Sequence, residues 1–170
     1  MAGVGSANDR ECPEETAARS MGGPGPVLDH EELCRFLYRV DHLSADGRFT
    51  PAALPTRDLL DPQRERLSVG RLTYLTAQDV GRMVSEREQR TSANQFSGGG
   101  VAVTADFRRL RTHDGRRELC VVDDSRDGFN AHALLRLANA TAYNRASVRR
   151  LRERLINLFN FCPASALLDS

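Results

Sequence analysis

Residues 118–124 read ELCVVDD, the clearest candidate for a buried β-strand in this chain. The segment RTHDGRR (111–117) precedes it and SRDGFN (125–130) follows it, and both are rich in turn-forming residues. A short apolar run between two turn signals is typical of a strand that is buried on both faces. The aspartates that follow could hold a divalent cation, but aspartates also build turns, and the turn interpretation is favoured here.

Other segments have weaker strand signals. LSVGRL (67–72) alternates and VAV (101–103) is a short apolar run, so both are expected to be strands. A further strand is expected over 38–41, and AHALLRLANA (131–140) fits a strand or a helix equally well. The glycines of SGGG (97–100) are interpreted as a flexible hinge, because the lysine and hydroxyl of a phosphate-binding P-loop are missing.

Three longer segments are expected to be helical, besides a helix start at TPAAL (50–54) with Thr50 as its cap. Apolar residues recur at helical spacing in 29–37, with Asp29 as the expected N-terminal cap. A second helix is expected over 76–90, capped by Thr76, and a third over about 146–160. Strands and helices do not alternate regularly, so the pattern predicts an α+β protein: a small mixed sheet with short flanking helices and a C-terminal amphipathic arginine-rich helix.

Composition divides the chain into three parts. Residues 1–27 are rich in Gly, Ala, Ser, Pro and Glu and are expected to be a disordered leader. Residues 28–140 are expected to form the α+β domain, and residues 141–170 the C-terminal helix and tail. At 170 residues the chain has room for one domain with a substantial core.

The overall charge excludes a general electrostatic attraction to polyanions. The chain has 24 basic and 23 acidic residues, a formal net charge of +1. A nearly neutral protein has no general field that would draw it to nucleic acid or to an anionic membrane, so any such binding must come from a local patch. All the basic residues are arginine, which indicates a GC-rich genome, and a bacterial source is expected.

The four cysteines are widely separated and form no C-x-x-C pair. They are Cys12, Cys34, Cys120 and Cys162. This spacing is not that of a disulfide framework, and no apolar run approaches the roughly 20 residues of a membrane span, so we expect reduced thiols and a cytoplasmic location. His30 and Cys34 are four residues apart, but no second pair completes a metal site, so neither a metal nor another cofactor is expected.

The C-terminal helix carries the strongest functional signal. In VRRLRERLINLF (148–159), the apolar residues fall within one arc of a helix and the arginines lie largely outside it. Four arginines are therefore candidates for binding an acidic protein partner: Arg145, Arg149, Arg150 and Arg154. An ordinary solvated helix face and a nucleic-acid-binding patch are the alternatives, although no aromatic residue interleaves with the arginines as a single-strand platform would require.

An enzymatic alternative comes from the order of three residues. Arg39, Ser68 and Glu118, on successive expected strands, resemble the order in arginine-type ADP-ribosyltransferases, where they would hold the dinucleotide, brace the site and orient the ribose. The chain departs from that family because Val69 and Gly70 follow the serine and no second glutamate precedes the last position. His132 is a further candidate as a catalytic base; a buried, hydrogen-bonded imidazole is the favoured interpretation.

A second resemblance covers about residues 37–135. The segments LYRV, DGRFTPAAL, LSVGR, GVAVTA and NAHALL are similar to those of a group of short uncharacterised bacterial proteins with no established activity. The resemblance implies a compact domain in which six residues share a neighbourhood: Arg39, Arg48, Ser68, Arg71, Asn130 and His132. It adds no activity, so the expected function is a non-enzymatic interaction protein, with a protein partner or a second copy of itself bound through the arginine helix.

Overall fold

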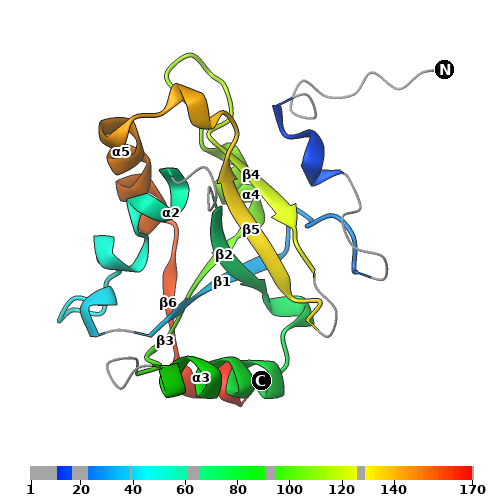
Figure 1. Ribbon diagram of the computed structural model, residues 1–170, viewed down its shortest axis with the longest axis vertical. Helices are drawn as coiled ribbons and strands as arrows, with labels where there is room; N and C mark the ends of the chain where they lie inside the picture. The colour runs from blue at the N-terminus through cyan, green and yellow to red at the C-terminus, as the bar shows by residue number, and fades with distance from the viewer. Residues whose placement is uncertain are drawn as a thin grey trace.

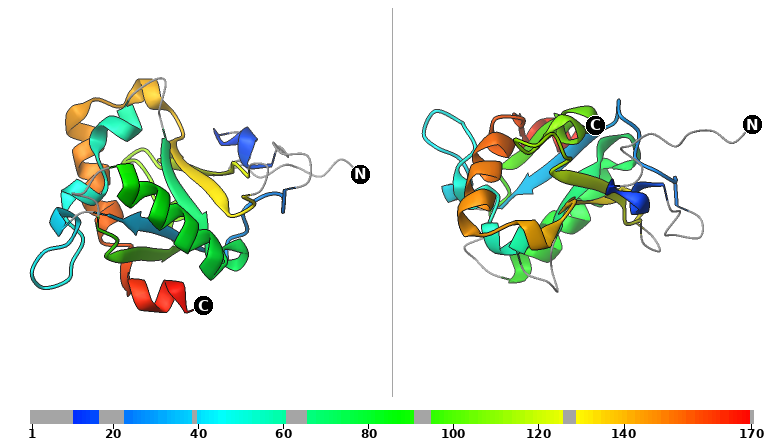
Figure 2. Two further views of the ribbon diagram at one scale, coloured as in Figure 1. Left: turned by 60° about the horizontal axis from the view of Figure 1, so that its bottom comes forward. Right: turned by 90° about the horizontal axis from the view of Figure 1, so that it is seen from above.

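The computed structural model describes residues 11–16, 23–38, 40–60, 66–90, 95–125 and 129–169. Their centre is one six-stranded sheet with helices on both faces (Figure 1; Figure 2). The strands are β1 (Glu32–Leu37), β2 (Arg66–Arg71), β3 (Gly98–Val103), β4 (Leu119–Asp123), β5 (His132–Leu137) and β6 (Asn160–Pro163). They lie in the order β4-β5-β2-β1-β3-β6, and every pairing between them is antiparallel. The α+β class is thus confirmed, with an antiparallel sheet in place of a mixed one.

Short helices connect and cover these strands. The α-helices are α2 (Thr56–Leu60), α3 (Ala77–Arg90), α4 (Thr104–Arg109), α5 (Arg145–Ile156) and α6 (Ala164–Leu168). The 3-10 turns are η1 (Pro13–Glu15), η2 (Val40–His42), η3 (Pro51–Ala53), η4 (Leu72–Tyr74) and η5 (Ala140–Ala142). The predicted helix over 76–90 is confirmed as α3, whose first turn is capped by the Thr76 hydroxyl accepting from the Asp79 N–H at 3.1 Å.

The main core lies between one face of the sheet and the helices α2, α4 and α5. Leu67 and Val69 of β2 contribute to it, together with Leu119 and Val121 of β4. Each fully buried side chain of this kind stabilises the fold by roughly 1.5–3 kcal/mol relative to its solvent-exposed state. The stretch ELCVVDD is buried as predicted, and β4 covers Leu119–Asp123 of it.

The opposite face of the sheet is covered in two places. Helices α3 and α6 lie over one part (Figure 2), where Val80 and Leu167 pack with Cys34 of β1. The η1 turn lies over β4, where Cys12 packs with Cys120 and Val122. Both faces of β1 and β4 are therefore buried.

This two-sided burial explains why the expected helix over 29–37 is wrong. Leu33 and Leu37 face the main core while Cys34 and Phe36 face α3 and α6. Apolar residues therefore lie on both faces of β1, and apolar and polar residues do not alternate along it. A strand buried on both faces can imitate the spacing of a helix over a short run. The strand expected over 38–41 is also wrong, because residues 40–42 form the η2 turn; residue 39 lies outside the described residues.

The three glycines expected to form a hinge instead begin strand β3. A Cβ on Gly100 would lie 2.0 Å from Cζ of Phe49, and one on Gly99 would lie 2.3 Å from Sγ of Cys34. Phe49 is in turn stacked on Phe159, with ring centroids 5.5 Å apart. The glycines are therefore required by close packing across the sheet, and the hydrogen-bonded ladders to β1 and β6 offset their entropic cost.

Two further segments differ in detail from the sequence pattern. Within residues 1–27, which composition predicts to be a disordered leader, the described segments 11–16 and 23–27 contain η1 and the buried Val27. The ambiguous segment 131–140 contains strand β5. Helix α5 ends at Ile156, four residues earlier than expected, because Asn160–Pro163 leaves it to pair with β3 as strand β6.

Candidate functional site

Helix α5 is fixed to the body of the protein by its cap and its apolar side. The Asn144 side chain accepts from the backbone N–H groups of Ala146 and Ser147, both at 3.0 Å, and the Ser147 hydroxyl accepts from the Asn144 N–H at 2.8 Å. This capping box satisfies N–H groups that would otherwise lack partners at the helix start. Val148, Leu151 and Leu155 are at most 1% exposed, so the helix presents its remaining faces to solvent.

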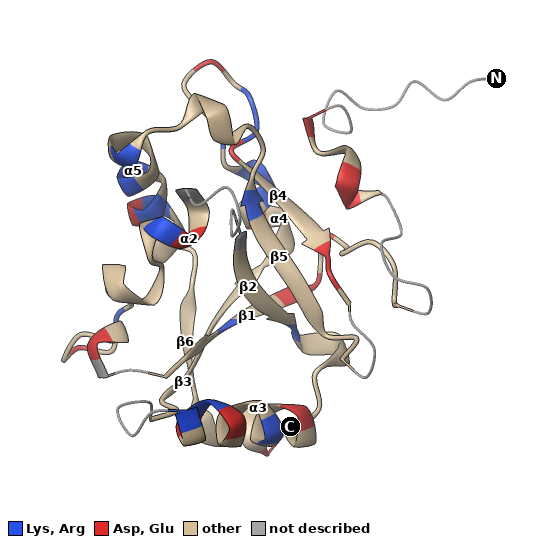
Figure 3. Cartoon of the chain, in the orientation of Figure 1, with Lys and Arg blue, Asp and Glu red and all other residues tan. Residues whose placement is uncertain are grey.

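The four candidate arginines divide into two kinds. Arg145, Arg149 and Arg150 are exposed, and Figure 3 shows basic residues gathered along α5. Arg154 is half-exposed and donates to the Glu118 carboxylate at 2.5 Å and to the Arg111 carbonyl at 3.2 Å. Arg154 therefore contributes to the attachment of α5, whereas the other three point their charge towards solvent.

Glu118 serves the same attachment. Its side chain is 8% exposed and also lies 3.3 Å from the Tyr143 hydroxyl. Burial, together with the nearby Glu118 carboxylate, raises the pKa of Tyr143, so the phenol stays protonated and can donate to that carboxylate. Glu118 is thus surrounded by groups that connect β4 to the C-terminal helix.

The residues of the enzymatic alternative are not brought together. Ser68 is exposed on β2 and pairs with Leu134 of β5, whereas the Glu118 carbonyl accepts from the N–H of Ala138. The four residue steps from Leu134 to Ala138 separate these positions by about 13 Å along the sheet. Arg39 lies outside the described residues. The arrangement gives no support to a shared site of Ser68 and Glu118.

His132 lies at the other end of β5, about 20 Å from the level of Ala138 by the rise of a strand. Its Nδ1 is 2.9 Å from the carboxylate of Asp124, which is the orienting partner that the sequence could not identify. The same nitrogen is 3.2 Å from the Asp124 carbonyl oxygen. A largely buried imidazole with two contacts to Asp124 fits the structural interpretation that the sequence favours.

Arg71 is the centre of a buried ion cluster. It lies next to His132, because Gly70, the residue before Arg71 in β2, pairs with His132 of β5. The Arg71 guanidinium donates to both oxygens of Glu31, at 2.8 and 2.7 Å, and to Asp123 at 3.1 Å. It also donates to the carbonyls of Gly25 and Pro26, and lies 4.7 Å from the centre of the Tyr74 ring. With 0% exposure and so many partners, this arginine has a structural role.

The neighbourhood implied by the resemblance forms only in part. Arg71, Asn130 and His132 meet at one end of the sheet, where the Arg71 N–H donates to the carbonyl of Ala131 at 2.6 Å. Arg48 is 85% exposed in the turn after η2 and pairs with Asp46, away from that end.

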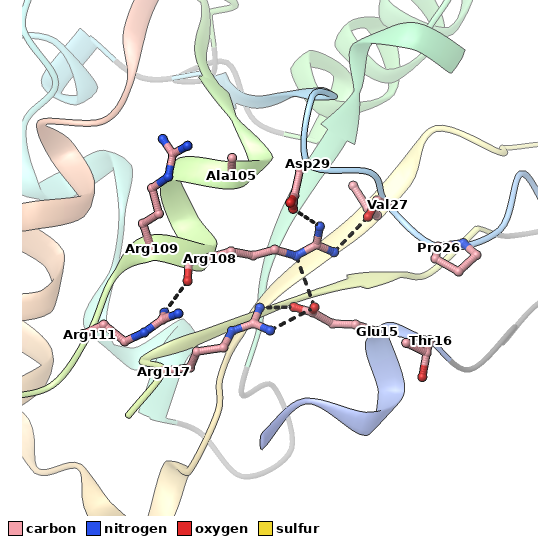
Figure 4. A pocket seen from close by; sticks show the side chains of 10 residues that line it. All are labelled: Glu15, Thr16, Pro26, Val27, Asp29, Ala105, Arg108, Arg109, Arg111 and Arg117. Carbon is pink, nitrogen blue, oxygen red and sulfur yellow. Dashed lines mark hydrogen bonds and ion pairs between the residues drawn. The ribbon is translucent and has the colours of Figure 1, made fainter. Parts of the chain in front are cut away.

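A second ion cluster involves residues that the sequence placed in the leader. Cys12 forms a disulfide with Cys120 of β4, across 108 residues of chain, so the expectation of four reduced thiols is wrong. The disulfide holds η1 against β4, and Glu15 of η1 reaches between Arg108 and Arg117 (Figure 4). Cysteine spacing gave no signal of this pairing, because it depends on the chain folding back.

His30 and Cys34, the pair at chelating spacing, lie in different environments. His30 is exposed before β1, while Cys34 is fully buried, and burial raises the pKa of its thiol to about 12. Cys12, Cys120 and Glu15 do lie within 4.8 Å of one another. However, the disulfide uses both sulfurs, and Glu15 already accepts from two guanidinium groups, so this cluster offers no thiolate to a metal.

Comparison with protein-family models, with curated proteins and with solved structures found no match to this chain. Among the described residues, no helix is both long enough and apolar enough to cross a membrane. The functional argument therefore depends on the geometry of the chain itself.

Proposed function

We propose that this protein is a non-enzymatic interaction protein that binds an acidic surface of a partner protein through the exposed arginines of α5. The supporting observation is that one side of α5 is buried against the protein while another side carries exposed arginines. Val148, Leu151 and Leu155 attach it to the sheet, while Arg145, Arg149 and Arg150 are exposed beside them. A helix that is already rigid loses little conformational freedom when its guanidinium groups meet carboxylates.

The proposal includes the setting that the sequence predicts, a bacterial cytoplasm. Disulfides of cytoplasmic proteins are usually transient or redox-sensing, so the Cys12–Cys120 bond would have to be of that kind there. A persistent disulfide in the protein as isolated from its own cells would place the interaction in an oxidising compartment instead.

The test compares the wild type with Arg149→Glu/Arg150→Glu as bait in an extract of the source organism. We expect a partner that is retained at low salt, is released as salt is raised, and is lost with the double variant. Arg90→Glu is the matched control, because Arg90 is exposed at the end of α3 on the opposite face of the sheet. Retention by both variants, or loss by both, would count against the proposal.

Two further measurements separate the alternatives. Light scattering of the purified protein would show whether the partner is a second copy, because Arg149→Glu/Arg150→Glu would then shift the protein towards monomer. Fluorescence anisotropy with a duplex DNA oligonucleotide tests the nucleic-acid alternative. Tight DNA binding that the double variant abolishes would replace the present proposal, since phosphate contacts dominate such binding.

A further inference from the structure

The carboxylate of Glu15 is bound as a ligand would be. Both terminal nitrogens of Arg117 donate to it, at 3.2 and 2.5 Å, in a two-pronged arrangement. Nε of Arg108 donates at 3.1 Å and the backbone N–H of Val121 at 2.6 Å. Four N–H groups therefore converge on one carboxylate: one from α4, one from β4 and two from Arg117. Glu15 itself is 8% exposed.

This carboxylate forms one wall of a pocket of about 420 Å³ (Figure 4). The charged residues of the lining are Arg108, Arg109, Arg111, Arg117, Glu15 and Asp29. The lining thus carries an excess of two positive charges, and Arg109 also pairs with Asp106 outside it at 3.1 Å. In addition, Nε of Arg117 is buried and has no hydrogen-bond partner among the described residues. The excess charge of the lining favours a further anion.

The segment that delivers Glu15 is attached by the disulfide and by polar contacts: the Glu11 carboxylate accepts from the Arg117 N–H at 3.0 Å, and Glu14 pairs with Arg136 at 2.7 Å. In residues 11–16, Cys12 and Glu15 are the buried members, one linked by its sulfur to Cys120 and the other held by the arginines. Figure 1 shows η1 as a short turn against β4, outside the layers of the main sheet and its long helices. Without the disulfide, the Glu15 carboxylate would compete for the arginines from a tethered segment that polar contacts alone hold in place.

We propose that this pocket, bounded by Arg108, Arg109, Arg111 and Arg117, is a binding site for a phosphate group, and that Glu15 is its built-in competitor. A dianionic phosphate matches the excess charge and offers more acceptor oxygens than a carboxylate. The Cys12–Cys120 disulfide keeps Glu15 in place. A dithiol reductant transfers two electrons and two protons to it, which leaves two cysteine thiols and an oxidised dithiol, and the Glu15 segment can then leave the arginines.

The experiment is a calorimetric titration of the full chain with inorganic phosphate. The oxidised wild type is compared with the dithiol-reduced wild type and with oxidised Glu15→Gln. We expect the reduced wild type and oxidised Glu15→Gln each to bind phosphate at least about ten-fold more tightly than the oxidised wild type. Reduction releases the competing Glu15 carboxylate, and the Gln variant removes its charge. Glu14→Gln is the matched control, because Glu14 pairs with Arg136 outside the pocket, and it should bind like the wild type.

Two further arms make the result decisive. Arg109→Gln changes a 77% exposed wall residue, so it should weaken phosphate binding to the reduced protein several-fold while thermal unfolding stays unchanged. Succinate, titrated in parallel, separates a phosphate site from a general carboxylate site. Equal affinity for succinate would overturn the phosphate assignment. Equal phosphate affinity of the oxidised wild type, the reduced wild type and Glu15→Gln would overturn the competitor role of Glu15.

Discussion

The Arg71 and Glu15 clusters use the same chemistry in two different settings. In each, a buried guanidinium binds both oxygens of a glutamate. Arg71 belongs to β2, and its carboxylate partners lie beside β1 and in β4, so regular hydrogen-bonded structure encloses the pair. Glu15 belongs to a three-residue turn that a disulfide attaches beside an open pocket.

The comparison shows that burial of an ion pair does not by itself define its role. The two carboxylate partners of Arg71, Glu31 and Asp123, are both buried, so exchange of either carboxylate would require the fold to open. The Glu15 carboxylate could leave with the movement of one short segment once its sulfur link is broken. The first cluster therefore suits structure, and the second suits an exchangeable ligand.

The largest effect is expected at the enclosed cluster. Arg71→Met removes the guanidinium and leaves the buried carboxylates of Glu31 and Asp123 without it, which costs about 3–5 kcal/mol of unfolding free energy. Urea unfolding followed by circular dichroism measures this loss. Arg48→Met, at an arginine with an 85% exposed side chain, should change stability by less than about 0.5 kcal/mol. A mild effect of Arg71→Met would remove the distinction between the two clusters.

A smaller effect is expected when the Glu15 segment is released. Reduction, or the double variant Cys12→Ser/Cys120→Ser, should cost about 2–4 kcal/mol, because a disulfide that closes so long a loop restricts the unfolded chain. Thermal unfolding with and without a dithiol measures the cost. Cys162→Ser, at a free and partly exposed cysteine, is the control. The reduced protein should keep its far-ultraviolet spectrum, and loss of the sheet signal would mean that the disulfide supports more than one segment.

The smallest effect is a pH dependence at the enclosed cluster. Burial alone would raise the pKa of Glu31, but hydrogen bonds from Arg71 and from the Leu28 N–H outweigh it, so the pKa lies below the ordinary value of 4.5. A lowered folded-state pKa adds stability above the ordinary pKa, and this stability is lost as the pH falls through the folded-state value. Urea midpoints between about pH 6 and about pH 3 should therefore fall less steeply for Glu31→Gln. Parallel slopes for variant and wild type would contradict this assignment.

Sequence patterns predicted the elements that are buried on one face or that have clear turn signals. Helix α3 begins at its expected cap, and the ELCVVDD strand is buried as expected, because both signals are local. The pattern of residues 29–37 predicts a helix where β1 lies because the two faces of this strand contact different layers. The glycines of β3 have the composition of a hinge, since the neighbours that require them come from distant segments. Local patterns do not report which side chains approach from elsewhere in the chain.

The candidate sites follow the same division. The exposed arginines of α5 were predictable, because a helix with a continuous apolar stripe leaves its remaining positions to solvent. The pairing of Arg154 with Glu118, and the orientation of His132 by Asp124, depended on contacts between separate elements.

From the amino-acid sequence alone, the α+β class, the strand at residues 119–123 and the basic face of the last helix could be deduced, since each depends on neighbours within a few residues. The tertiary structure decided the antiparallel order of the strands, the Cys12–Cys120 link and the arginine pocket around Glu15. These features join positions up to 108 residues apart. Such pairings are selected by the packing of the whole chain, and no local periodicity encodes them.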